Sequence, residues 1–183
     1  MIAYVICDSV YGKQLLKTIL PKRSLNQVEV VSTTGISSVK SLARSLVVLR
    51  QVPVFIVVDA DSTIPELNQQ YSKDIAEIVE SVSVNTPVKV FLFVPEMESI
   101  FFQDIHLLSR LLGYSPSQDE LDRAVTQPRK VLEHLISRSE VVRDKSEAID
   151  RLANENLEIL QSAPVIQELI HFLESVREPV KVL

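Results

Sequence analysis

The pattern of hydrophobic and polar positions divides the chain into two parts, and in the first part strands alternate with helices. Short apolar runs of strand length lie at residues 2–7, 28–31, 54–58 and 88–94. Between these runs, apolar residues recur at helical spacing around residues 15–20, 39–49, 66–82 and 97–112. This alternation predicts an α/β fold with a four-stranded parallel sheet flanked by helices on both faces. Right-handed crossovers allow the strand order 2-1-3-4.

The second part of the chain predicts helices after a polar stretch. Residues 115–128 are polar and typical of a loop. Helical periodicity follows at about 128–138, 144–161 and 163–177, with a further short strand at Val180–Val182. We therefore expect an α/β domain over residues 1–114 and a helical extension over residues 115–183, packed on the same domain.

Composition narrows the class of protein. The 183 residues are 46% hydrophobic, which suits one domain with a sizeable core. The net charge of -5 argues against a general binder of polyanions, so contact with nucleic acid would need a local patch or a metal ion. The single cysteine, Cys7, excludes an internal disulfide and a cysteine-based zinc site, and we expect it in the core. The start of the chain lacks the basic segment of a signal peptide and no apolar run reaches ~18 residues, so we expect a cytoplasmic protein without membrane contact.

Acidic residues follow three of the predicted strands. They are Asp8, Asp59, Asp61, Glu96 and Glu98. Parallel strands bring their carboxyl ends to one edge of the sheet, where ligands bind beside the point at which the strand order reverses. Carboxylates without neighbouring Cys or His suit Mg²⁺ or Mn²⁺, and such a site supports phosphodiester chemistry.

We predict three roles among these five acids. Asp59 and Asp61 are the best candidate metal ligands, and Asp8 is a candidate base or metal ligand. Glu96 and Glu98 are candidates for a second metal site. Each acid also has a local alternative, in a turn or at the N-terminus of a helix.

Four motifs follow one another in a fixed order along the chain: Asp8 after the first strand, Thr33-Thr34-Gly35, Asp59-Ala60-Asp61, and Pro95-Glu96-Met97-Glu98. This ordered set resembles the Toprim fold, which topoisomerases, bacterial primases and OLD-family nucleases share. The likeness is closest to small stand-alone Toprim proteins related to OLD nucleases, and it extends to the helical end of the chain. The resemblance implies Mg²⁺- or Mn²⁺-dependent nuclease chemistry on DNA or RNA, with Asp8, Asp59 and Asp61 as catalytic residues.

Three departures from the family pattern leave a second function open. The family usually has Glu-Gly after the first strand, where this chain has Asp8-Ser9, and the acid often found four residues later is Gly12 here. Nearby Lys13 is a candidate phosphate contact. The Gly-x-x-x-x-Gly-Lys-Ser/Thr motif of an ATPase does not occur in the chain, so we expect any partner ATPase to be a separate subunit. The alternative is an inactive Toprim-like module that binds nucleic acid or a partner ATPase or nuclease subunit.

A receiver-like signalling domain also collects acids at a sheet edge, but it needs two acids after the first strand and a Lys after a fifth strand. Neither is present in the predicted pattern.

The remaining polar residues give weaker signals. The histidines, His106, His134 and His171, lie on separate predicted helices, which favours surface or packing roles. Arg129 and Lys145 are interleaved with acids and carry no clear signal. The apolar helix at 97–112 packs against the helical extension or against a second subunit, and the sequence leaves a homodimer open.

Overall fold

The computed structural model describes residues 3–26 and 28–176, and it contains the predicted parallel sheet. The strands are β1 (Ala3–Cys7), β2 (Val28–Ser32), β3 (Val54–Asp59) and β4 (Val88–Phe93), in the order β2-β1-β3-β4. All three neighbouring pairs are parallel. The chain reverses its direction of progress between β1 and β3, so their carboxyl ends flank the position where such sheets bind ligands.

The central strand β1 shows why this sheet is covered on both faces. All five of its residues are buried. Successive side chains point to opposite faces of a strand, and Ala3, Val5 and Cys7 join one hydrophobic cluster while Tyr4 and Ile6 join another. A strand that buries both faces needs an unbroken apolar run, which is the pattern that the sequence has there.

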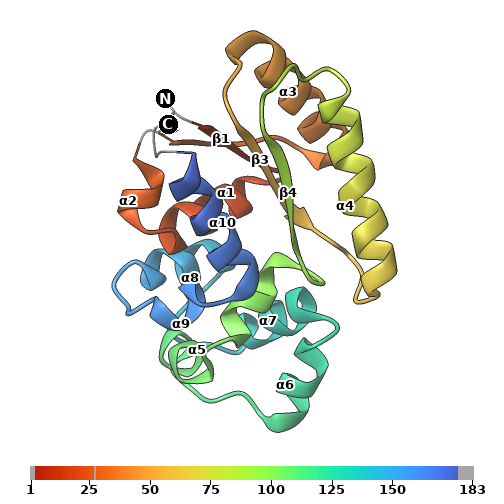
Figure 1. Ribbon diagram of the computed structural model, residues 1–183. Coiled ribbons are helices and arrows are strands. Elements are labelled where there is room, and N and C mark those ends of the chain that lie inside the picture. Colours follow the sequence, from red (N-terminus) through yellow and green to blue (C-terminus); the bar gives the residue numbers. More distant parts are fainter. Residues whose placement is uncertain (1–2, 27, 177–183) are drawn as a thin grey trace.

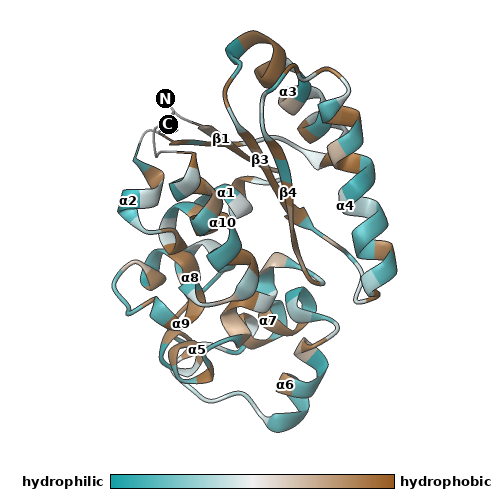
Figure 2. Ribbon diagram, viewed as in Figure 1, coloured by the Kyte–Doolittle hydropathy of each residue, from teal (hydrophilic) through white to brown (hydrophobic). Residues whose placement is uncertain are grey.

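Two layers of helices cover the sheet (Figure 1). Helices α3 (Gly35–Arg50) and α4 (Pro65–Glu80) lie on one face. Helices α1 (Val10–Ile19) and α10 (Pro164–Ser175) lie on the other, with the short α2 (Lys22–Leu25) beside them. Figure 2 shows apolar residues concentrated on the strands and polar residues on the outer side of α4. Among the described residues, no helix has both the length and the hydrophobicity needed to cross a membrane.

The helices after β4 differ in detail from the prediction. The stretch at 97–112 is a 3₁₀ helix, η1 (Met97–Phe102), followed by α5 (Ile105–Leu112). The break occurs because the Asp104 side chain accepts a hydrogen bond from the Leu107 N–H and starts a new helix. The predicted loop at 115–128 contains α6 (Gln118–Ala124), which a reciprocal capping box between Ser117 and Glu120 stabilises.

The last part of the chain is helical, as predicted, but it is more divided. Helix α7 spans Pro128–Ser137, and the predicted 144–161 helix is split into α8 (Lys145–Leu152) and α9 (Glu158–Gln161). The strand predicted at 180–182 lies outside the described residues.

One hydrophobic cluster joins these helices to the sheet. It includes Val5 and Phe91 from the strands, Leu132 from α7, Ile149 from α8 and Ile166 from α10. Each of these side chains is at most 2% exposed. The division at residue 114 is therefore crossed by a continuous core, and its status as a domain boundary stays a prediction.

Candidate functional site

The five acids that the sequence singled out lie at or beside the carboxyl edge of the sheet. Asp59 is the last residue of β3, Asp8 directly follows β1, and Asp61 lies two residues beyond Asp59. Glu96 immediately precedes η1, and Glu98 is the second residue of that helix. Because β1 and β3 are adjacent and parallel, their ends place Asp8 and Asp59 on the same side of the molecule.

Arg129, the second residue of α7, lies at the centre of this acidic group. Its Nη2 donates to Asp59 Oδ2 at 2.6 Å, and its Nη1 lies 3.3 Å from Glu96 Oε1. Its Nε lies 3.5 Å from Glu98 Oε1. The Arg129 backbone N–H also donates to Glu96 Oε2 at 3.0 Å, which fixes the start of α7 against the site. One guanidinium thus neutralises part of the charge on three carboxylates.

Glu98 is buried and only partly satisfied. Its side chain is 2% exposed, and its Oε1 accepts a hydrogen bond from Lys145 Nζ at 2.9 Å. Its Oε2 is buried without any hydrogen-bond partner. A buried carboxylate oxygen without a donor is costly, so this atom marks a position where a positive ligand would be favourable.

Among the carboxyls of the site, Asp59 has a strongly raised pKa. Burial raises its pKa to about 7, the Glu98 carboxylate adds to the rise, and the Met97 N–H and Arg129 oppose it. The Met97 N–H donates to Asp59 Oδ1 at 2.7 Å. Burial also raises the pKa of Asp8, with a further contribution from Asp61. Both carboxyls therefore ionise less readily than an exposed aspartate, and for Asp59 this holds even with Arg129 beside it.

Arg129 itself stays charged in this setting. Burial disfavours its charged form, but the carboxylates of Glu98, Glu96 and Asp59 outweigh that penalty and raise its pKa above the usual value. The negative charge of these carboxylates thus keeps the Arg129 guanidinium fully protonated.

Asp61 and Lys13 lie further from the centre. The Asp61 side chain is 72% exposed, and its Oδ1 is 4.0 Å from Arg129 Nη2. Its backbone has φ of +53°, a conformation that Asp tolerates better than most residues. Lys13 lies on α1 and is half-buried. Its role as a phosphate contact stays a prediction.

A cavity of about 280 Å³ opens among these side chains. It is lined by Asp8, Ser9, Tyr11, Asp59, Met97, Glu98, Arg129 and Lys145. Burial raises the pKa of the Tyr11 hydroxyl, with Glu98 and Asp59 adding to the rise, and that hydroxyl is buried without a hydrogen-bond partner. The cavity is therefore lined by three carboxyl groups, two cations and the hydroxyls of Ser9 and Tyr11.

The donor chemistry fits a hard divalent cation, although the arrangement does not form a ready coordination shell. Within the part of the chain that is described, no group of three or more His, Cys, Asp or Glu side chains is placed to hold a metal ion. Asp59, Glu96 and Glu98 contact Arg129 instead. Five carboxylates against two cations still leave an excess of negative charge, and oxygen ligands suit Mg²⁺ or Mn²⁺.

The local alternative of an acid in the first turn of a helix applies to Glu98 in η1, but the capping alternatives for the other acids are not what the structure contains. Ser9, and not Asp8, caps α1 by accepting the Gly12 N–H. Helix α4 begins at Pro65, and no side chain caps it, so neither Asp59 nor Asp61 serves that purpose. Glu96 lies in the N-cap position of η1 but makes no capping hydrogen bond.

The sequence analysis missed Arg129 and Lys145. Asp59 and Arg129 are separated by 70 positions, and the residues around Arg129 give no local signal of the contact. The start of each of the helices α7 and α8 carries one cation into the site, and this convergence depends on how the helical part folds back on the sheet.

The histidines stay outside this site. His134 Nε2 lies 3.6 Å from Glu120, and the His171 ring packs edge-on against Phe172.

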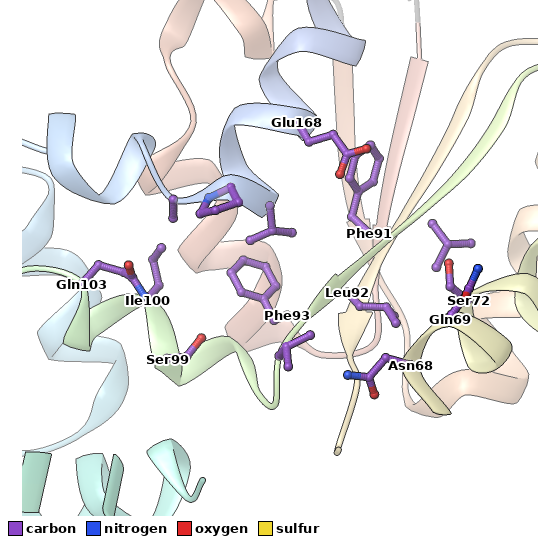
Figure 3. A pocket seen from close by; sticks show the side chains of 15 residues that line it. Asn68, Gln69, Ser72, Phe91, Leu92, Phe93, Ser99, Ile100, Gln103 and Glu168 are labelled. Atoms are coloured by element: carbon purple, nitrogen blue, oxygen red, sulfur yellow. The ribbon is translucent and has the colours of Figure 1, made fainter. Parts of the chain in front are cut away.

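A larger cavity of about 500 Å³ lies elsewhere, along the edge strand β4 (Figure 3). Phe91, Leu92 and Phe93 form its floor, with Asn68 from α4 and Glu168 from α10 at its sides (Figure 3). Glu168 is paired with Lys89 Nζ at 2.7 Å. This lining is mostly apolar and does not gather the charged groups that distinguish the carboxyl edge.

The fold matches a known protein. Two solved structures of the C-terminal region of the OLD protein from Xanthomonas campestris pv. campestris are similar to this chain. The first has a TM-score of 0.56 at 15% sequence identity, and the second has a TM-score of 0.54 at 13% identity. In both comparisons 95% of each chain is covered. No family model matches the chain, and a search of curated proteins finds no match either. The predicted likeness to OLD-related proteins is thus confirmed at the level of the fold.

Proposed function

We propose that this chain hydrolyses phosphodiester bonds of DNA or RNA with the help of Mg²⁺ or Mn²⁺. The observation that carries the proposal is the convergence of Asp8, Asp59, Glu96 and Glu98 on one edge of a sheet, with the buried Glu98 Oε2 left without a partner. The likeness in fold to the C-terminal region of an OLD protein supports the same conclusion.

In the proposed reaction the side chains bind the metal ion, contact the phosphate or accept a proton. Asp59, Glu96 and Glu98 would hold the metal ion, with Asp61 and Asp8 completing its surroundings. The bound metal supplies Lewis-acid activation of the phosphate and lowers the pKa of a water ligand. Lys145 and Arg129, which line the same cavity, would contact the phosphate, and Lys13 is a further candidate for that contact. Asp8 is the candidate base that receives a proton from the attacking water.

The test is a cleavage assay on DNA and RNA with Mg²⁺ or Mn²⁺. We expect cleavage that EDTA stops and that Asp59→Ala abolishes. The matched control is Asp119→Asn, because the Asp119 side chain is 84% exposed on α6, away from the site. Cleavage that survives Asp59→Ala, or that proceeds in EDTA, would contradict the proposal.

A second candidate function is a module that binds without turnover. Two observations favour it: Asp8 is one methylene shorter than the Glu that the family usually has, and Arg129 already offsets part of the charge of the acids. Such a module would bind nucleic acid or a separate ATPase or nuclease subunit. Folded protein that binds oligonucleotides but cleaves none with either metal would support this function.

A further inference from the structure

The Arg129 guanidinium lies where the carboxylates of the site converge. It contacts Asp59 at 2.6 Å, Glu96 at 3.3 Å and Glu98 at 3.5 Å. We propose that Arg129 is a resident counter-ion that competes with the divalent metal for these carboxylates and has to leave them before the metal loads. This inference rests on the proposed function, because it concerns how the same site is controlled.

Electrostatics explains why the site needs a cation when no metal is bound. Several carboxylates this close together repel one another strongly in a partly buried setting. The guanidinium offers five N–H donors in a planar fork, so it can serve three carboxylates at once. The arrangement without metal is stabilised by the protein itself, and the metal has to displace an interaction that already exists.

The Arg129 guanidinium does not satisfy every carboxylate oxygen of the site, and Glu98 is the example. Glu98 is 2% exposed, and Arg129 Nε and Lys145 Nζ both contact its Oε1. Its Oε2, equally buried, has no donor. A divalent cation carries twice the charge of Arg129 and is coordinated by several oxygens, so it can satisfy an atom that the guanidinium leaves alone.

Arg129 is also placed so that its side chain can leave. It is 39% exposed, whereas Asp59 is 13% and Glu96 18% exposed. Its backbone N–H holds Glu96 Oε2 independently of the side chain, so a rotation of the side chain does not disturb the start of α7. The released guanidinium would still border the cavity, where a phosphate of nucleic acid is a matching anion.

The test measures metal binding and not turnover. Mn²⁺ affinity is determined by electron paramagnetic resonance for the wild type, Arg129→Ala and Lys130→Ala. Lys130 is the exposed neighbour of Arg129 on α7, so its removal costs the same unit of charge without touching the site. We expect Arg129→Ala to bind Mn²⁺ at least about tenfold more tightly than the wild type. Lys130→Ala should differ by much less, because an exposed charge is screened by solvent and salt.

A second variant controls for folding and for charge. Arg129→Lys keeps the positive charge but loses the fork, and we expect an affinity between those of the wild type and Arg129→Ala. Circular dichroism confirms that each variant is folded. In the Arg129→Ala background, Asp59→Ala should remove the gain in affinity.

The outcomes distinguish a failure of the proposed role of Arg129 from a failure of the proposed metal-dependent function. Equal Mn²⁺ affinity in the wild type and Arg129→Ala, with measurable binding in both, would overturn the role of Arg129 and leave the proposed function standing. Absence of Mn²⁺ binding from every folded variant would overturn the metal site itself, and with it the inference.

Discussion

Asp59 combines three properties at the scale of a single residue. It ends a buried strand, it accepts hydrogen bonds from Met97 and Arg129, and burial raises its pKa to about 7. An acid with a pKa near neutrality changes its charge within the range of pH in which most proteins work. The affinity of this residue for a cation therefore depends on pH.

We expect the stability of the protein to fall as the pH rises from about 4 to about 7. In this window the folded state binds more protons at Asp59 than the unfolded state does, because the pKa is raised from 3.8 to about 7. The free energy of unfolding then decreases by up to ~1.4 kcal/mol per pH unit from this one group. Urea denaturation at several pH values measures the slope.

Asp59→Asn should flatten that part of the pH dependence, because an amide does not titrate. Asp119→Asn, which changes an exposed acid, should leave the slope as it is. The same slope in the wild type and Asp59→Asn would show that Asp59 titrates near its ordinary pKa in the folded protein.

Single residues also show how far the sequence could predict the site. The acids could be predicted to lie close together because each follows a strand, and the carboxyl ends of parallel strands lie at one edge of the sheet. Arg129 and Lys145 have no such positional rule. Their contacts depend on the angle at which α7 and α8 pack, and this angle is set by many core side chains and not by neighbouring residues. The partners of a charged surface residue are among the features that a single sequence specifies least.

At the scale of elements, the turn after α5 depends on one glycine. Gly113 ends this helix with φ of +78°, in the left-handed region. A Cβ atom built at this position would lie 2.5 Å from Val141 Cγ2, closer than real Cβ atoms approach. With any other residue at position 113, the Val141 side chain or the backbone of this turn would have to shift.

We expect Gly113→Ala to lower the free energy of unfolding by about 2–3 kcal/mol, from backbone strain and the clash with Val141. Gly35→Ala is the matched control. Gly35 also has positive φ, +74°, but no heavy atom lies within 4 Å of its added Cβ, so a loss of only about 1 kcal/mol is expected. Thermal or urea denaturation compares the two. Equal losses would mean that Val141 moves away at little cost.

The elements themselves were predicted where periodicity was long and unbroken. The four strands and helices α3 and α4 follow from it. The predicted helix boundaries were wrong where a side chain caps a new helix, as Asp104 does for α5 and Ser117 for α6. Both signals are present in the sequence, as an Asp three residues before Leu107 and as Ser117 three residues before Glu120, but the apolar and polar periodicity around them conceals them.

At the scale of the whole molecule, one core connects the sheet with the helical part. Leu132, Ile149 and Ile166, from three different helices of residues 115–176, join the cluster that lies on one face of the sheet. We therefore expect the protein to unfold in a single transition, seen at the same temperature by circular dichroism and by calorimetry.

A fragment of residues 1–114 should fail to fold cooperatively, because it exposes the apolar face that these helices cover. A folded fragment, or two separate transitions in the full chain, would show that the division at residue 114 separates independent domains.

Strand β1 also contains a thiol whose reaction with reagents reports on the opening of the sheet. Cys7 is the single cysteine of the chain; its side chain is 0% exposed, and burial raises the pKa of its thiol to about 12. Thiol reagents attack the thiolate, so the native protein is protected both by the absence of access and by the absence of the reactive form. Modification must wait until β1 parts from its neighbours. When the reagent reacts faster than β1 closes again, the labelling rate equals the rate at which this interior strand opens, and no engineered probe is needed.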